Sequence, residues 1–162
     1  MITLLETISR KTSLALAALS GACLTLMMLL ACANMVLRGA GGPLQGTFEL
    51  MGYLGALTAA FSLGYAQLER SHIAVGLLMH YFPRPVRRAL DALTSLASAV
   101  FFWLGAVETA KWAAFLRRTG ELSETLGVPH YPFVYLTAFG CAAMAFVLAV
   151  DTVRSLAGRL DS

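Results

Sequence analysis

Glu49 is the acidic residue in this sequence that could most readily have a chemical role, because it lies near one end of an otherwise apolar stretch. Ionisable groups at membrane depth are often functional, so a carboxylate here could exchange protons or bind a cation. Near the start of a helix a carboxylate is also stabilised by the helix dipole and unpaired backbone N–H groups, or by an arginine such as Arg38. The shallow position of Glu49 favours this structural interpretation and leaves a cation-coupling site as the alternative.

The three histidines do not have the placement of haem or metal ligands. His72 and His80 lie eight residues apart in one short segment, and His130 is expected on the opposite side of the membrane. A haem site needs two axial ligands at matching depth, or one ligand with a suitable pocket. We therefore predict no cofactor and no metal.

The remaining motifs give no sign of catalysis either. The sequence has no nucleophile motif, no phosphate loop and no Lys/Arg-rich run with interleaved aromatics. We predict that the chain is not an enzyme and has no nucleic-acid partner. The cysteines lie inside apolar stretches, without the spacing of a zinc site or a disulfide framework, and are interpreted as packing residues: Cys23, Cys32 and Cys141.

The elements that would position these residues are long apolar helices. Hydrophobic residues make up 58% of the 162 residues and charged residues 13%, with a mean hydropathy of +0.71. A soluble domain of this size needs more charge to cover its surface. We predict an all-α membrane protein with one domain over residues 1–162. Its four transmembrane helices are expected at about 12–37, 47–68, 89–116 and 130–153, since uncharged runs longer than about 18 residues mark spanning helices.

The span expected at 89–116 is the least uniform, because it carries Glu108 and Lys111. These residues are three apart, so they share a helix face and can neutralise each other as an ion pair. The first span has a different ambiguity, since Ala31-Cys32-Ala33 fits a signal-peptidase pattern. Its uncharged run is longer than the roughly 7–15 residues of a signal-peptide core, so we favour an uncleaved span.

The distribution of basic residues predicts the orientation in the membrane. Cytoplasmic loops of membrane proteins carry an excess of Lys and Arg. Eight basic residues fall on the side of the two termini and of the middle connection, and four on the other side. We therefore expect a multi-pass protein of the bacterial inner membrane with both termini in the cytoplasm.

The middle connection is expected to lie along the membrane surface. Residues 72–82 are apolar but too short to span, and Pro83 and Pro85 follow them. We predict a short interfacial amphipathic helix at 72–82, with Arg84, Arg87 and Arg88 facing lipid headgroups. An ordinary connector explains these arginines equally well. The first eleven residues could form a second surface helix.

Two spans carry small residues at every fourth position, which lets another helix approach closely. The pattern does not say whether that helix belongs to this chain or to a partner. The stripe in the second span comprises Gly52, Ala56, Ala60 and Gly64, and the stripe in the last span comprises Thr137, Cys141, Ala145 and Ala149.

The order of these features resembles one known family, the DctQ-like small membrane subunits of tripartite ATP-independent periplasmic (TRAP) transporters. The resemblance covers most of the chain. It rests on Asn34-Met-Val-Leu-Arg38 followed by Glu49-Leu-Met-Gly-Tyr-Leu54, on Glu69-Arg-Ser-His-Ile-Ala-Val75, and on Leu126-Gly-Val-Pro129 with Tyr131, Tyr135 and Phe139-Gly140.

The resemblance implies a non-catalytic role. In such transporters a periplasmic binding protein captures an organic acid, and a large membrane subunit carries it with coupling ions. The small subunit is expected to brace the large one, with Arg70 and His72 fixing the cytoplasmic end of the second helix and Glu49 its periplasmic end. The alternatives are a self-contained four-helix exporter that uses Glu49 for proton exchange, and a haem-bearing membrane anchor.

Overall fold

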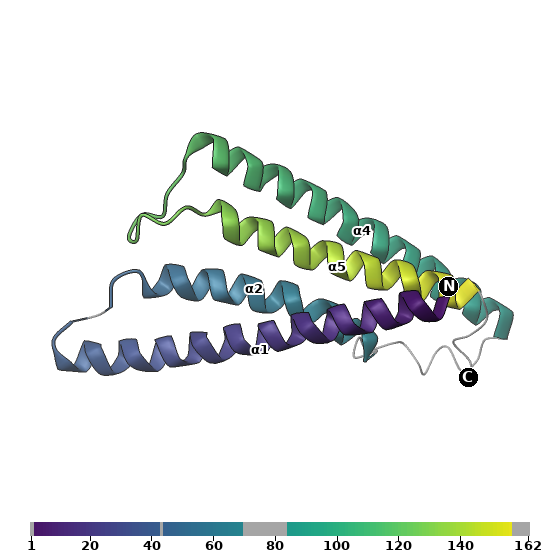
Figure 1. Cartoon of the computed structure of the whole chain (residues 1–162), viewed down its shortest axis with the longest axis horizontal. Coiled ribbons are helices and arrows are strands. Elements are labelled where there is room, and N and C mark those ends of the chain that lie inside the picture. The colour runs from purple at the N-terminus through teal and green to yellow at the C-terminus, as the bar shows by residue number, and fades with distance from the viewer. Residues whose placement is uncertain (1, 43, 70–83, 157–162) are drawn as a thin grey trace.

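The computed structural model describes residues 2–42, 44–69 and 84–156. Within these ranges the chain forms four helices, α1 (Ile2–Ala40), α2 (Thr47–Leu68), α4 (Arg84–Thr119) and α5 (Tyr131–Leu156), together with one isolated β-bridge between Leu122 and Pro129. The helices run antiparallel in sequence order (Figure 1). The all-helical fold class is thereby confirmed.

Three helical segments of the described chain are long and apolar enough to cross a membrane: Thr7–Ala40, Leu90–Thr119 and Tyr131–Val153. Helix α2 is not among them. The expectation that α2 also crosses the membrane therefore stays a prediction, as does the orientation of the bundle.

Two helices extend further than the sequence suggested. Helix α1 is continuous from Ile2, so residues 2–11 do not form a separate surface helix. Its 39 residues correspond to about 58 Å at 1.5 Å per residue, well beyond the roughly 30 Å of a bilayer's hydrocarbon core. Helix α4 begins at Arg84 rather than at residue 89. Pro85 fits there because the N–H that proline lacks has no helical acceptor in the first turn.

The early start of α4 changes the place of the predicted headgroup residues. Arg84, Arg87 and Arg88 belong to the first turns of this helix and not to a connecting loop. Arg70, His72 and the predicted interfacial segment 72–82 lie outside the described residues.

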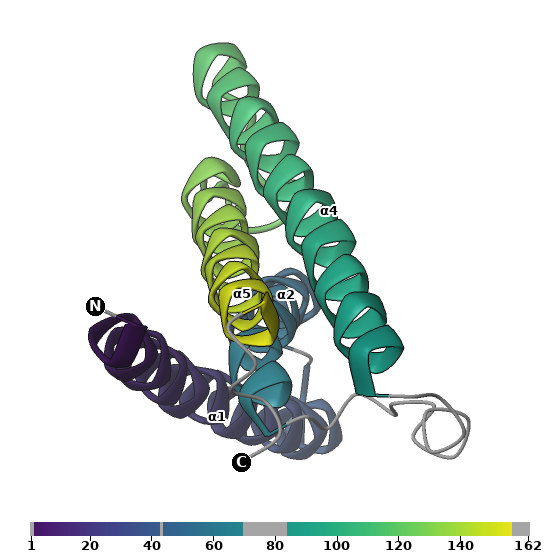
Figure 2. The same ribbon diagram turned by 90° about the vertical axis from the view of Figure 1, so that its right-hand side faces the viewer.

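The helices form two hairpins, α1 with α2 and α4 with α5. The hairpins meet mainly through α2 and α5, which lie between α1 and α4 when the bundle is viewed from the end that holds the N-terminus (Figure 2). The turn between α1 and α2 and the loop between α4 and α5 lie together at the opposite end (Figure 1), which is called the loop end below.

Small residues let the helices of the two hairpins approach closely within the bundle. A Cβ atom added to Gly140 of α5 would lie 2.8 Å from both the Cβ and the carbonyl oxygen of Ala60 in α2. One turn further along α2, a Cβ on Gly64 would lie 3.2 Å from Ser13 Oγ of α1. The α2 backbone therefore approaches both neighbouring helices because it carries no larger side chains there.

Larger apolar side chains fill the space around this contact. Leu16, Leu57 and Phe61 form a buried cluster between α1 and α2, and Phe133 and Ala143 of α5 pack against it. A second cluster joins α4 to α5. In the middle of the first hairpin, Ser20 Oγ donates a hydrogen bond of 2.9 Å to the carbonyl oxygen of Thr58. Dispersion between closely packed side chains is the main attraction available to helices in lipid.

Replacement of Gly140 by alanine is predicted to destabilise the bundle by about 1 to 3 kcal/mol, the usual cost of inserting a methyl group where backbone atoms must move. Gly105→Ala is the matched control, because a Cβ there meets no atom within 4 Å and should be neutral or slightly stabilising. Thermal unfolding of the full chain in detergent measures both. Equal melting temperatures for the two variants would contradict the close contact.

Candidate functional site

The turn between α1 and α2 is fixed by hydrogen bonds to both helices. Thr47, the first residue of α2, is 1% exposed, and its Oγ1 donates to the carbonyl oxygen of Leu44 at 2.7 Å. The backbone N–H of Leu44 donates in turn to Oδ1 of Asn34 in α1, at 2.9 Å. The start of α2 is therefore held in place relative to the end of α1.

Glu49 lies one half-turn into α2 and connects this helix to the other hairpin. Its carboxylate accepts hydrogen bonds from the backbone N–H of Thr125 at 2.9 Å and of Leu126 at 3.3 Å. The two donors are consecutive residues of the loop between α4 and α5, so each carboxylate oxygen takes one of them. Hydrogen bonds to an ionised acceptor are about twice as strong as neutral ones.

The loop that Glu49 binds has its own internal order. Ser123 is 5% exposed, and its Oγ accepts from the backbone N–H groups of Leu126 and Val128 at 3.3 and 3.2 Å. The N–H of Ser123 donates to the carbonyl oxygen of Val128 at 2.9 Å, which closes the loop on itself. Gly127 has φ 64°, a conformation that other residues rarely adopt.

A side-chain contact accompanies the hydrogen bonds of Glu49. Leu126 of the loop covers Gly46, directly before α2, so closely that any Cβ on Gly46 would overlap the leucine side chain. Gly46 also has φ 77°, so only glycine meets both requirements without strain. The α1–α2 turn and the α4–α5 loop thus fit together as one unit.

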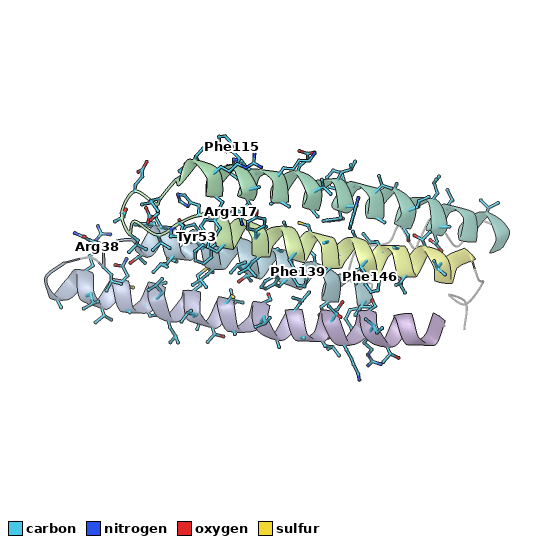
Figure 3. All side chains as sticks on the ribbon, turned by 45° about the horizontal axis from the view of Figure 1, so that its top comes forward. Arg38, Tyr53, Phe115, Arg117, Phe139 and Phe146 are labelled. Carbon is cyan, nitrogen blue, oxygen red and sulfur yellow. The ribbon has the colours of Figure 1, made fainter. Side chains whose placement is uncertain are left out.

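Tyr53 makes a second connection one turn further into α2. Its hydroxyl lies 2.5 Å from Nδ1 of His130, and its ring stacks on Phe133 with a centroid separation of 4.3 Å and an interplanar angle of 4°. His130 and Phe133 flank the start of α5. Figure 3 shows Tyr53 towards the loop end of the bundle, the end where Arg38 closes α1.

These contacts define what the loop end can do chemically. Both oxygens of Glu49 are occupied by backbone donors, and the hydroxyl of Tyr53 is bonded to His130. Among the described residues, no group of three or more His, Cys, Asp or Glu side chains is placed to hold a metal ion. The arrangement fastens the two hairpins together at the loop end.

The other predicted residues lie elsewhere. Lys111 Nζ is 2.7 Å from Glu108 Oε1, and both side chains are about two-thirds exposed. The α2 stripe is divided, with Ala60 and Gly64 buried inside the bundle and Gly52 and Ala56 exposed. None of these residues is a hydrogen-bond partner of Glu49 among the described contacts.

Sequence reasoning missed the partners of Glu49, which are backbone groups 76 and 77 residues away. The sequence also does not reveal the role of Ser123 or the pairing of Tyr53 with His130, although Leu126-Gly-Val-Pro129 and Glu49-Leu-Met-Gly-Tyr-Leu54 are both local signatures. Gly127 in the Leu126–Pro129 signature indicates an ordered turn. No feature of either segment alone, however, predicts that the two segments are in contact.

The fold and the loop end together define an all-helical protein with helices suited to a membrane and a structural connection at one end. A family model for the DctQ component of tripartite ATP-independent periplasmic transporters matches residues 27–158. The chain belongs to this family, the small membrane subunits of TRAP transporters. No curated protein and no solved structure matches the chain.

The variant Glu49→Gln is predicted to loosen the α4–α5 loop without unfolding the bundle. An uncharged amide accepts only one of the two hydrogen bonds, and less strongly. The backbone amides of Thr125 and Leu126 should then exchange with deuterium several-fold faster in the full chain. Glu124→Gln, an exposed acid of the same loop, is the control and should leave the exchange rates unchanged. Unchanged exchange in the Glu49 variant would show that the carboxylate does not hold the loop.

Proposed function

We propose that this TRAP small subunit is a non-catalytic brace. It holds the scaffold of the large membrane subunit still during ion-coupled uptake of an organic acid that a periplasmic binding protein delivers. The observation that carries the proposal is the connection of the two hairpins at two levels. Gly140 and Ala60 are in contact within the bundle, and Glu49 binds the opposite loop at its end.

A brace must keep its two hairpins in a fixed arrangement while its partner moves. The packing of Gly140 on Ala60 and the hydrogen bonds of Glu49 together favour such a fixed arrangement. One contact alone would leave the hairpins free to pivot about it. With a second contact many residues away along α2, a pivot must break either close packing or charge-assisted hydrogen bonds. The bundle is therefore suited to a static role.

A brace also needs a surface for its partner, and the outer face of α4 fits this requirement. Helix α4 packs mainly on α5 and exposes large side chains elsewhere, of which Phe115 is visible on the outer side in Figure 3. A stripe of them runs at helical spacing along the half of α4 nearer the loop end: Phe101, Leu104, Trp112 and Phe115.

The ion pair of Glu108 and Lys111 lies within this stripe and inside the apolar segment Leu90–Thr119. Charged groups at membrane depth are costly against lipid, and in membrane proteins they almost always face other protein or a water-filled cavity. The pair therefore marks the stripe as a protein-covered face, and the large subunit is the partner that would cover it.

The geometry of Glu49 does not favour the alternative, a self-contained proton-coupled exporter. An exchanging carboxylate must be reachable from both sides of the membrane in turn, whereas Glu49 lies near the start of α2 with both oxygens hydrogen-bonded to the loop. Exchange of protons for cations by the chain alone in liposomes would support the exporter instead.

The double variant Glu108→Leu and Lys111→Leu is predicted to reduce the amount of large subunit that co-purifies with the tagged chain at least several-fold, because it removes polar groups that the partner matches. The control is Lys11→Leu with Glu121→Leu, which removes one base and one acid at exposed positions off this face. Co-purification is measured from native membranes in mild detergent. Recovery equal to or better than that of the unaltered chain would place the pair against lipid and contradict the proposed interface.

A further inference from the structure

The end of the bundle opposite the loop end contains a cavity of about 460 Å³ between α1, α2 and α5. Its wall combines charged side chains, Arg10, Glu69 and Asp151, with apolar ones that include Leu14, Leu68 and Val150. The volume is in the range of small-molecule sites, which are typically about 300 to 1,000 Å³. Neither the connection at the loop end nor the α4 face uses this cavity.

The charged residues of the cavity indicate the depth at which it would lie in a membrane. Glu69 and Asp151 each end an uncharged run of the sequence, and Arg10 with Lys11 precedes the first one. Charged residues that bound apolar helices lie where the hydrocarbon core gives way to the headgroups. The cavity therefore opens at the depth of lipid headgroups, with its apolar wall towards the acyl chains.

The charges are of both signs, which indicates the chemistry of a ligand. Arg10 and Glu69 form no ion pair in the part of the chain that the structure describes. Asp151 accepts a hydrogen bond from Gln67 Nε2 at 3.2 Å and adds a second negative charge to the wall. A guanidinium is suited to a phosphate group and carboxylates to an ammonium group, whereas a purely anionic ligand would be repelled by the two acids.

A buried hydroxyl points to the same conclusion by a separate route. Ser9 lines the cavity and is only 2% exposed, yet its Oγ has no hydrogen-bond partner. A buried polar group without a partner costs about 1 to 3 kcal/mol, so such groups in native proteins are normally satisfied. A phosphate bound to Arg10, the residue that follows Ser9 in α1, would supply the missing acceptor.

We propose that this cavity binds the headgroup of a zwitterionic phospholipid that carries a phosphate and a primary ammonium. The phosphate lies against Arg10 and Ser9, and the ammonium against Glu69 and Asp151. The first carbons of the acyl chains lie against Leu14, Leu68 and Val150. The bound lipid would fasten α1 to α2 and α5 at the end of the bundle that lacks the Glu49 connection. This inference concerns a site of its own and does not depend on the bracing role.

Native mass spectrometry of the purified transporter complex tests the proposal, with phosphatidylethanolamine and phosphatidylglycerol of identical acyl chains as probes. The unaltered complex should bind phosphatidylethanolamine in preference. Glu69→Gln should lower the affinity for phosphatidylethanolamine about tenfold, the effect of roughly 1.4 kcal/mol, and should not weaken phosphatidylglycerol. Arg10→Gln should weaken both lipids, because both carry the phosphate.

Matched controls separate this site from general surface charge. Lys11→Gln changes the neighbouring base, which does not line the cavity, and Glu121→Gln changes an exposed acid elsewhere in the chain. Both should bind the two lipids as the unaltered complex does. Equal affinity of the unaltered complex for both lipids, or equal effects of Arg10→Gln and Lys11→Gln, would overturn the proposal.

Soluble phosphoethanolamine distinguishes a lipid site from a site for the free headgroup. It shares the phosphate and ammonium but lacks the acyl chains that would contact the apolar wall. Phosphoethanolamine should therefore compete only weakly with the lipid. Displacement of the lipid by an equal concentration of phosphoethanolamine would show that the ligand is the soluble compound and that the lipid assignment is wrong.

Discussion

Helices α2 and α5 approach each other so closely at Ala60 and Gly140 that there is no room for a side-chain atom on the glycine. The two hairpins of this protein meet mainly through these helices, so their relative position depends on this contact. In lipid there is no water to expel from between helices, and close packing must supply the attraction. Larger side chains at either position would separate the helices and weaken the apolar clusters on both sides. Ala60 and Gly64 of the α2 stripe are therefore used for packing within the chain.

The Glu49 carboxylate provides a second connection between the two hairpins, at the loop end. It binds two consecutive backbone N–H groups of the loop between α4 and α5, while Leu126 covers Gly46 beside it. A helix start and a loop from opposite hairpins thus become one unit at the loop end. For the small subunit of a TRAP transporter, this gives the acid a structural task that needs no proton exchange.

The sequence allowed the helices to be predicted better than their contacts, for reasons that particular residues make clear. Uncharged runs and terminal charges are local signals, and they located α2 and α5 closely, whereas α1 begins ten residues before the predicted span. The predicted span begins at residue 89 because the apolar run starts there, whereas α4 begins at Arg84, where a first helical turn accepts both charged residues and Pro85. The predicted stripe of small residues in α5 includes Cys141, whereas the observed contact is made by its neighbour Gly140. An alanine-rich helix carries small residues on several of its faces, so the sequence does not show which face makes the contact. The partners of Glu49 are backbone groups, which carry no side-chain signature that a sequence could reveal.

The central claim is that the two hairpins move as one body, and a distance measured between them during transport tests it most directly. Spin labels at Leu19 of α1 and Leu96 of α4, both exposed, report this distance by pulsed electron paramagnetic resonance. The three native cysteines are first replaced by alanine, and the labelled chain is assembled with its large subunit in liposomes. We predict one narrow distance distribution that stays the same when coupling ion and substrate-loaded binding protein are added. A distribution that shifts or divides on their addition would show that the hairpins move during transport and would contradict a static brace.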